Sequence, residues 1–285
     1  MEQNNLFKEL LRDIKRNNNG GFSCYLRRIG LFRAIVLQKM KKNVLISVPL
    51  FFNKKMNVIT GETVSRNLIA FGYTEVALTA LMLKNLFDGD IFVDIGTHYG
   101  YEALLASEIV GTNGQVYSFE PNPTSFSIAE KNLKLPNCIL YNYAVGDYNG
   151  IAKIESKDIE QSAFNSIVDK ETPSVKSIEI KIVTLDDIMK NRKNAVKFIK
   201  CDVEGFEMQV LKGARQLIDE DRPLLVLEAD MPINGKPSER AIQLQNYMAT
   251  IGYIAYNFDL VDGNLKIETL GSFSVEHANV LFKPN

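Results

Sequence analysis

The sequence predicts an α/β fold in which helices cover both faces of a mostly parallel sheet. Two observations predict it. From residue 90 onward, short apolar stretches alternate with helical stretches of roughly ten or more residues, which is the pattern of parallel strands joined by crossover helices. The stretches 196–199 and 224–227 are apolar at nearly every position, as expected for strands that are buried on both faces.

Composition and charge limit the class of protein. The chain has 285 residues, of which 46% are hydrophobic and 24% charged, and this allows a large core and excludes wholesale disorder. The 33 Lys+Arg and 34 Asp+Glu nearly balance, but residues 1–60 hold 12 of the former and only 3 of the latter. We therefore expect a basic N-terminal extension, residues 1–60, followed by the main domain, residues 61–285.

The N-terminal extension is expected to contain helices and an extended segment. The predicted elements are helices at 4–16 and 22–42 and an extended segment at 44–60, after which a helix at 62–86 leads into the main domain. We expect the basic second helix to dock on the sheet or on a partner subunit. The sequence is therefore compatible with a homo-oligomer. The alternative is contact with an anionic membrane, or with a phosphorylated glycan, through its Lys and Arg side chains.

The main domain is expected to alternate strands and helices along the chain. Strands are predicted at 91–96, 115–121, 138–145, 177–183, 196–205, 223–230, 252–260 and 277–283. Helices are predicted at 99–110, 123–135, 185–190, 209–220 and 238–250. In such sheets ligands bind outside the carboxyl ends of the strands, so the residues that end the strands are the candidate site.

A glycine-containing loop follows the first of these strands and runs from Asp94 through Gly96 to Gly100. Glycine permits a tight turn and lets a ligand approach the backbone. The spacing Gly-x-x-x-Gly differs from the G-x-G-x-x-G of dinucleotide enzymes. A carboxylate beside the loop also favours a cationic or amine-bearing ligand over a diphosphate.

Acidic residues end three further strands. Glu120 ends the second strand, at a position where an acid in doubly wound folds accepts hydrogen bonds from ribose hydroxyls. Asp202 and Glu204 follow the fourth central strand, and Glu228 and Asp230 end the next one. Carboxylates this close perturb each other's proton affinity, as a general base or a metal ligand requires. Helix capping could account for one or two of these acids but not for all of them.

Cysteine usage and hydropathy bear on where the protein works. The cysteines Cys24, Cys138 and Cys201 form no CxxC pair, which is typical of a reducing cytosol and predicts neither a disulfide framework nor a zinc ribbon. No run of 18 apolar residues predicts a membrane span, and the polar N-terminus has no apolar region of a signal peptide. We therefore expect a cytoplasmic protein without a transmembrane segment.

The main domain resembles a known family in five motifs. It contains, in order, FVDIGTHYGYEALLA, VYSFEPNP, YNYAVGD, VTLDDI and FIKCDVEGFEMQVLKGA. This succession is similar to the FkbM family of S-adenosylmethionine-dependent methyltransferases, over roughly residues 66–285. The resemblance implies a class I methyltransferase (Rossmann-like) fold, with a seven-stranded sheet whose last strand is antiparallel. It also implies S-adenosyl-L-methionine as cofactor and methyl transfer, usually to a hydroxyl oxygen of a sugar or a secondary metabolite.

The resemblance further implies which residues bind the cofactor. The positions that match the glycine loop are Asp94, Gly96, Thr97, His98 and Gly100. Glu120 matches the ribose-binding acid, with Asn122 next to it, and the segment beside the adenine ring is matched by Tyr143, Ala144 and Val145. Asp202 matches the reaction end, where the methyl group is transferred, and Glu75 matches an upstream glutamate. The sequence departs from the family at Thr97–His98, where Ala-Asn is more frequent.

Methyl transfer to an alcohol needs a base, because the hydroxyl keeps its proton at neutral pH. We expect Asp202 or Glu204 to be this base, with Glu228 and His98 as further candidates. An alternative is Mg²⁺ held by Asp202, Glu204 and Glu228, which would lower the proton affinity of the hydroxyl. We expect no metal, although the sequence leaves this variant open.

Three other function classes can be weighed against methyl transfer to a small molecule, sugar or glycan. A nicotinamide-dependent oxidoreductase shares the sheet architecture, but the spacing of the loop glycines disfavours it. A binding module without activity would not need the acids at the strand ends. Nucleic acid is a poor substrate, because the segment after the fourth central strand has acids and no aromatic platform.

Overall fold

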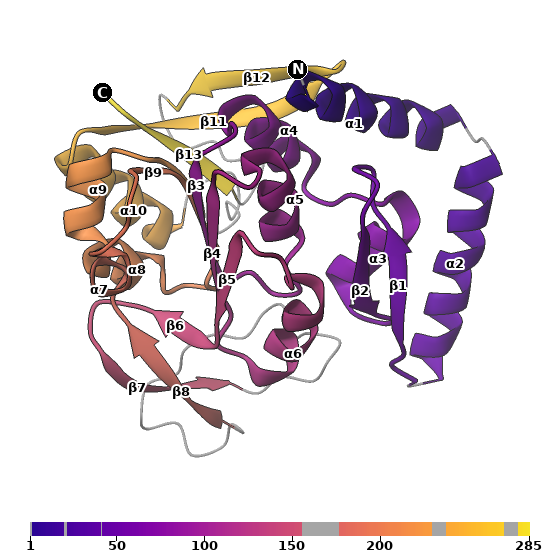
Figure 1. Ribbon diagram of the computed structural model, residues 1–285, viewed down its shortest axis with the longest axis horizontal. Helices are drawn as coiled ribbons and strands as arrows, with labels where there is room; N and C mark the ends of the chain where they lie inside the picture. Colours follow the sequence, from indigo (N-terminus) through magenta and orange to yellow (C-terminus); the bar gives the residue numbers. More distant parts are fainter. Residues whose placement is uncertain (1, 20–21, 41, 156–176, 230–237, 271–278) are drawn as a thin grey trace.

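The computed structural model describes residues 2–19, 22–40, 42–155, 177–229, 238–270 and 279–285, and an eight-stranded sheet lies at its centre (Figure 1). Parallel strands form the middle of the sheet, in the spatial order β5 (Cys138–Tyr141), β4 (Gln115–Phe119), β3 (Ile91–Ile95), β9 (Val196–Cys201) and β10 (Leu224–Glu228). Antiparallel β13 (Asn279–Pro284) lies between β10 and β11 (Tyr253–Val261). The mostly parallel α/β sheet with an antiparallel last strand is confirmed.

The order of the strands creates a switch point at β3. From β3 the chain passes to β4 and β5 on one side of it and then returns to β9 on the other side. The loops that leave the carboxyl ends of β3, β4 and β9 therefore diverge and open a crevice between them, which is where ligands bind in sheets of this kind.

Alternate side chains of the strands enter two separate cores, as the twofold period of a strand requires. Phe92 and Phe198 belong to one core, whereas their neighbours Val93 and Ile199 belong to the other. Helices cover both faces: α4 (Val76–Asn85), α5 (Tyr101–Val110) and α6 (Pro123–Asn132) on the first; α7 (Leu185–Met189), α8 (Glu207–Gly213), α9 (Arg215–Asp221) and α10 (Glu239–Thr250) on the second.

The sheet contains one strand more than the seven predicted. The additional strand, β12 (Asn264–Thr269), forms an antiparallel hairpin with β11 and lies at the edge of the sheet. Asp262 and Gly263 form its turn, and both have positive φ angles, 51° and 76°. Asp-Gly between two stretches of alternating polarity is a strong hairpin signal, so the sequence did contain the information for this strand.

Three elements predicted as continuous are broken in two. The helix predicted at 62–86 is α3 (Thr63–Phe71) and α4, because Gly72 ends α3 with a left-handed backbone, φ 78°. The strand predicted at 138–145 is β5 and β6 (Tyr143–Val145), which belong to different sheets. The helix predicted at 209–220 is α8 and α9, which meet at Ala214.

A second, three-stranded sheet lies beside the carboxyl ends of the central strands (Figure 1). Its order is β6, β8 (Ser177–Val183) and β7 (Gly150–Glu155), and β8 has the bounds that the sequence predicts. β6 pairs with β8 in parallel and β7 pairs with β8 antiparallel.

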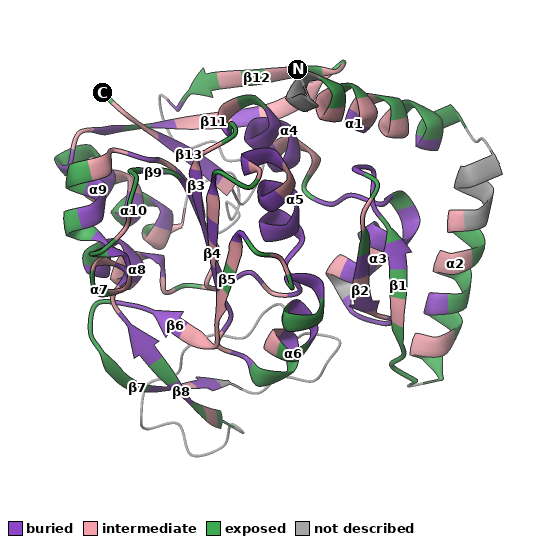
Figure 2. Cartoon of the chain, viewed as in Figure 1, coloured by how far each residue is buried: buried purple, intermediate pink, exposed green. Residues whose placement is uncertain are grey.

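The described elements within the first 60 residues form a layer outside α4 and α5. They are α1 (Glu2–Asn19), α2 (Phe22–Lys39) and the hairpin β1 (Leu45–Pro49)–β2 (Lys55–Ile59), which agrees with the extended segment expected at 44–60. Because this layer covers them, nearly every residue of α5 is buried, as is the whole stretch 78–83 of α4 (Figure 2).

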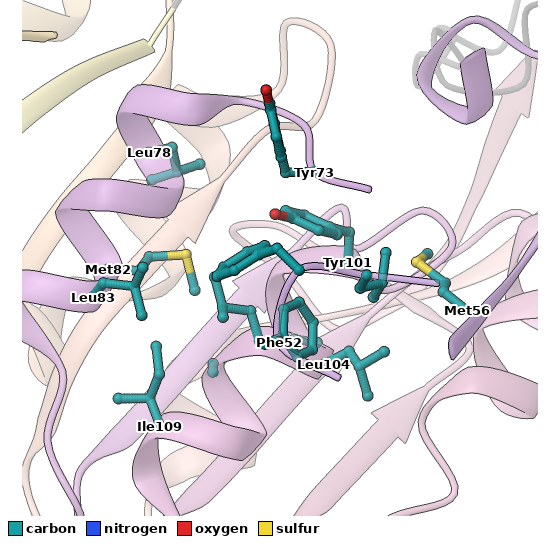
Figure 3. Close-up of a cluster of buried hydrophobic side chains, with 14 of the residues drawn as sticks. Phe52, Met56, Tyr73, Leu78, Met82, Leu83, Tyr101, Leu104 and Ile109 are labelled. Carbon is teal, nitrogen blue, oxygen red and sulfur yellow. The ribbon is translucent and has the colours of Figure 1, made fainter. Parts of the chain in front are cut away.

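The hairpin is joined to the main domain by side-chain packing. Phe52 and Met56 enter the same apolar cluster as Met82 and Tyr101 (Figure 3), and the rings of Phe52 and Tyr101 lie 6.3 Å apart. A division of the chain at residue 60 stays a prediction, but the two sides of that boundary share one core. In the part of the chain that the structure describes, no helix has both the length and the apolarity needed to cross a membrane.

Candidate active site

A pocket of about 950 Å³, partly open to solvent, lies at the carboxyl ends of β3, β4 and β9. The pocket brings together residues that are far apart in the sequence. From the predicted site it is lined by Glu75, Gly96, Thr97, His98, Glu120, Tyr143, Ala144, Val145, Asp202 and Glu204.

Gly96 allows two of the predicted motifs to touch. It adopts a left-handed backbone, φ 80°, and a Cβ atom there would collide with the carbonyl oxygen of Asp202. The backbone N–H of Asp202 donates to the carbonyl oxygen of Ile95 at 3.0 Å, so the β3 loop and the end of β9 are in direct contact. The residue must be glycine for both reasons, the conformation and the close approach.

Glu120 ties the glycine loop to the end of β4. Its carboxylate accepts hydrogen bonds from the backbone N–H of His98 at 2.8 Å and of Asn122 at 2.9 Å. Only 7% of the residue is exposed, and this burial raises its pKa to about 8. The side chain is thus held rigidly in the pocket wall by the backbone of both loops.

Three predicted cofactor-binding residues lie outside the pocket lining. Asp94 is completely buried behind the loop, where it accepts a hydrogen bond from the Thr97 hydroxyl at 2.6 Å. Gly100 begins α5, and a Cβ there would press against the side chain of Leu133. Asn122 caps α6 through its side-chain oxygen. In this structure all three shape the loops rather than face the pocket.

Aromatic residues form the wall at the end of β4 and β5. Phe119 stacks on Tyr141 with ring centroids 5.1 Å apart, and Tyr141 stacks on Tyr143 at 5.6 Å. Asn142 holds the chain between the two tyrosines by donating to the carbonyl oxygens of Glu120 and Pro121. Because Phe119, Tyr143 and the residues that follow it line the pocket, this wall suits a planar apolar group.

Lys200 is a pocket residue that the sequence analysis did not select. Its amino group lies 3.2 Å from the Asp202 carboxylate, 3.9 Å from that of Asp94 and 3.3 Å from the carbonyl oxygen of Gly96. Burial acts to lower the pKa of Lys200, but the surrounding carboxylates outweigh it and raise the pKa well above the usual value. The signal was a lysine inside an otherwise apolar buried strand, where a charge requires partners.

Glu102 was also missed, and Glu75 was expected. Glu102 lies in the first turn of α5, and its pKa is raised to about 8 by burial and by the nearby charge of Glu75. Glu75 precedes α4 with a left-handed backbone, φ 39°, and accepts a hydrogen bond from Asn279 at 2.8 Å. Both line the pocket, so its wall holds five carboxyl side chains and one lysine, and a cationic ligand would favour the ionised form of those carboxyls whose pKa burial raises.

The predicted catalytic acids form one cluster. Carboxylate oxygens of Asp202, Glu204 and Glu228 all lie within 4.8 Å of one another. Burial and the charge of Asp202 raise the pKa of Glu228 to about 9, and the two side chains are hydrogen-bonded. Burial acts to raise the pKa of Asp202, but Lys200 and Glu228 outweigh it and hold this pKa below its usual value. At neutral pH a protonated Glu228 therefore donates to an ionised Asp202.

The other candidates differ in position. Glu204 lines the pocket from a left-handed backbone, φ 52°, whereas Glu228 does not line it. His98 stacks on Tyr99 at 3.7 Å, and burial lowers the pKa of its imidazole to about 4, so the ring is neutral. Asp230 lies outside the described residues.

Comparison with known proteins identifies the family. The model of the methyltransferase FkbM domain matches residues 94–255, which include the glycine loop, Glu120 and the acid cluster. The chain belongs to the FkbM methyltransferase family. This membership implies S-adenosylmethionine as the cofactor.

Curated relatives match shorter stretches of this FkbM chain. It is 26% identical over 136 residues to the hexuronic acid methyltransferase AglP of Haloferax volcanii, covering 47% of this chain and 53% of AglP. It is 34% identical over 118 residues to a protein-L-isoaspartate O-methyltransferase of Methanococcus aeolicus, covering 37% of this chain and 51% of that protein. The chain thus spans about half the length of the curated relatives it matches.

Among solved structures, an FkbM methyltransferase of Methylobacillus flagellatus aligns with 76% of this chain and 52% of its own, at 17% identity and a TM-score of 0.46. Fibrillarin of Aeropyrum pernix, solved with bound S-adenosyl-L-methionine, aligns with 69% of this chain and 66% of its own, at 12% identity and a TM-score of 0.43.

Proposed function

We propose that this FkbM chain is an S-adenosylmethionine-dependent O-methyltransferase that methylates a hydroxyl group of a sugar, a glycan or a secondary metabolite. One observation carries the proposal: the acid cluster around Asp202 opens into a pocket that suits a nucleoside with a positive charge. The aromatic wall and the acidic lining are two properties that such a ligand requires at once. Family membership favours this transferase over a nicotinamide-dependent oxidoreductase.

Different pocket residues would contact different parts of the methyl donor, S-adenosylmethionine. Glu120 would accept hydrogen bonds from the ribose hydroxyls, because it is an acid at the tip of the second strand of the sheet. Tyr143, Ala144 and Val145 would pack against the adenine. Glu75, Thr97 and His98 would meet the amino-acid portion. When bound, S-adenosylmethionine supplies an electrophilic methyl group on a positively charged sulfur.

Asp202 is the proposed base. It lines the pocket and is ionised, because Lys200 and Glu228 stabilise its charge. A carboxylate in this state accepts the hydrogen bond of an acceptor hydroxyl, orients its oxygen and takes the proton as transfer proceeds. Glu228 acts as a positioning residue, since its hydrogen bond fixes the Asp202 carboxylate. Glu204 is the second acid within reach of the pocket, and His98, whose imidazole is neutral because burial lowers its pKa to about 4, is the further candidate there.

The acceptor class is supported by the relatives. AglP is a hexuronic acid methyltransferase and shares 26% identity over about half of each protein, which supports a sugar or sugar-acid acceptor here. Cofactor and acceptor together need a site that is accessible from outside, and the pocket is partly open to solvent.

The close spacing of Asp202, Glu204 and Glu228 favours a second variant of the same function, in which a divalent cation assists. Carboxylate oxygens are the ligands that Mg²⁺ prefers. The protonation of Glu228 disfavours this metal-assisted variant, because carboxylates that bind a metal must be ionised. Turnover that stops on addition of EDTA and returns with Mg²⁺ supports the metal variant, and unchanged turnover rejects it.

The test is a screen for transfer of labelled methyl from S-adenosylmethionine to sugars, uronic acids and small hydroxylated metabolites. With an acceptor in hand, Asp202→Asn is expected to bind S-adenosylmethionine within a few-fold of wild type and to lose at least 100-fold in turnover, as removal of a general base does. Asp219→Asn, the same change on the exposed face of α9, is the control and keeps its turnover. Full turnover by Asp202→Asn would show that another residue is the base.

A further inference from the structure

The helix α2 has an outward face that is apolar and basic at the same time. Phe32 is 68% exposed and Met40, just beyond the helix, is 57% exposed; smaller apolar side chains accompany them at Ile29, Ile35 and Val36. Large exposed apolar side chains gathered on one helix face mark a surface that binds something. We propose that this face of α2 docks on the surface of an anionic lipid bilayer.

The periodicity of the helix places these side chains in an ordered pattern. At 100° per residue, Phe32 and Val36 lie at the centre of the exposed face. Arg28 and Lys39 flank this apolar centre on one side, with Ile35 beyond them, and Arg33 flanks it on the other. An apolar stripe between basic borders is the design of a helix that lies in the plane of a membrane interface.

The opposite face of α2 is occupied within the protein. Ala34 is buried, and the side-chain oxygen of Gln38 accepts a hydrogen bond from Arg66 of α3 at 2.8 Å. The face is therefore held in a fixed orientation, with the apolar stripe directed away from the molecule. Figure 1 shows α2 as the outermost element on the side away from the central sheet.

The charge around this face has one sign. Between Asp13 and Glu62 the sequence contains no acidic residue, and it contains these basic ones: Lys15, Arg16, Arg27, Arg28, Arg33, Lys39, Lys41, Lys42, Lys54 and Lys55. Among the described residues, no ion pair involves the three basic side chains that border the stripe. Each such charge is attracted to an anionic bilayer, and the attraction falls off within a Debye length of the membrane surface.

The combination of an apolar stripe and basic side chains on α2 favours a lipid surface over other binding partners. A second copy of the chain, docked through the same face about a twofold axis, would bring Arg28, Arg33 and Lys39 against their own counterparts. Nucleic acid would use the charges but would gain nothing from Phe32 and its apolar neighbours. An anionic bilayer uses both, since its headgroups take the charges and its acyl boundary takes the stripe.

Docking would also bring the bilayer close to the pocket. The helix α3 lies between the two, because it packs on α2 and contributes Val64 and Leu68 to the pocket lining. Packed helix axes are separated by about 8–10 Å, so the docked surface is not remote from the site. The proposal stands on the geometry of α2 alone and does not depend on the proposed function.

The experiment is co-sedimentation of the full chain with vesicles of phosphatidylcholine, with and without phosphatidylserine. We expect binding to the phosphatidylserine vesicles at low salt and weaker binding at high salt, because the charges are screened. Phe32→Asp and the double variant Arg28→Gln/Arg33→Gln should each bind at least tenfold more weakly. Phe87→Asp is the matched control, since Phe87 is 53% exposed and lies outside α2, and it should bind as wild type.

Each outcome decides the proposal. Absence of binding by the wild type, or equal binding by wild type and Phe32→Asp, would overturn it. Sedimentation velocity without vesicles provides a further check: a wild-type dimer that Phe32→Asp converts to monomer would show that a second copy covers this face, and would overturn the lipid proposal as well. Because the substituted side chains are exposed, the variants are expected to keep the wild-type unfolding midpoint.

Discussion

The amino group of Lys200 lies 3.2 Å from the carboxylate of Asp202, and both side chains reach the same pocket from the end of β9. This ion pair is nearly closed to solvent on the lysine side, where 4% of the side chain is exposed. The ion pair also connects the glycine loop with the segment after β9, since the amino group of Lys200 contacts the carbonyl oxygen of Gly96. The charge state of the site therefore depends on one cation.

Lys200→Met is expected to destabilise the protein by about 3–5 kcal/mol at pH 7, because it leaves buried carboxylates without their counter-charge. The loss should become smaller at pH 4–5, where protonation of these carboxyls replaces the missing cation. Chemical denaturation at both pH values measures it. A variant as stable as wild type at pH 7 would show that Lys200 does not compensate Asp94 and Asp202.

Glu228→Gln tests the shared proton. In the wild type, turnover should fall as the pH rises through about 9, because Glu228 then loses the proton that it donates to Asp202. Glutamine keeps a donor at all pH values, so the variant should lose this alkaline limb and retain turnover at pH 7. The measurement is the pH profile of kcat with saturating cofactor. An unchanged alkaline limb in the variant would assign it to another group.

Glu102 should make the unliganded protein less stable as the pH rises. Its folded-state pKa is raised from 4.5 to about 8, so its contribution to stability is complete below pH 4.5 and is lost as the pH rises to about 8. Glu102→Gln is uncharged throughout and should lose less stability than wild type between pH 5 and 8. Parallel curves of unfolding free energy for the two proteins would contradict the shift.

Gly96→Ala separates close approach from backbone conformation when it is compared with Gly89→Ala. Both glycines have positive φ angles, 80° and 88°, but a Cβ at Gly89 has its nearest neighbour 4.0 Å away. The control should cost only about 1–2 kcal/mol for the left-handed conformation. Gly96→Ala should cost more and should weaken cofactor binding, because its Cβ would displace the Asp202 backbone. Equal losses of stability would show that the contact is unimportant.

Much of this site could be predicted from sequence, because its acidic side chains follow directly after apolar strands and the ends of parallel strands lie together. Asp202 and Glu120 follow buried strands, so a parallel sheet brings them together. Lys200 could not be recognised in the same way: along the sequence it is one polar residue within an apolar strand, and only the fold reveals the carboxylates around it. Asp94 illustrates the converse, since its position in the motif says nothing about whether it faces the pocket or, as here, the interior.

The fold was predictable where periodicity is long and was missed where single residues break it. The strands of the central sheet are buried on both faces and have clear apolar patterns. Gly72 and Asn142, in contrast, end elements within stretches that look continuous, because backbone conformation and hydrogen bonds to distant carbonyls decide those breaks. The N-terminal layer was recognisable as basic, but its packing over α5 depends on contacts with residues far along the chain.

The most direct test of the account is calorimetric titration of S-adenosylmethionine into the wild type and into Glu120→Ala. The wild type is expected to bind, and the variant to bind at least 10- to 100-fold more weakly, because removal of a carboxylate acceptor of two hydrogen bonds costs about 1.5–3 kcal/mol or more. Asn122→Ala, which removes only the cap of α6, should bind within a few-fold of wild type. No binding by the wild type, or equal affinity of wild type and Glu120→Ala, would contradict the assignment of this pocket to S-adenosylmethionine.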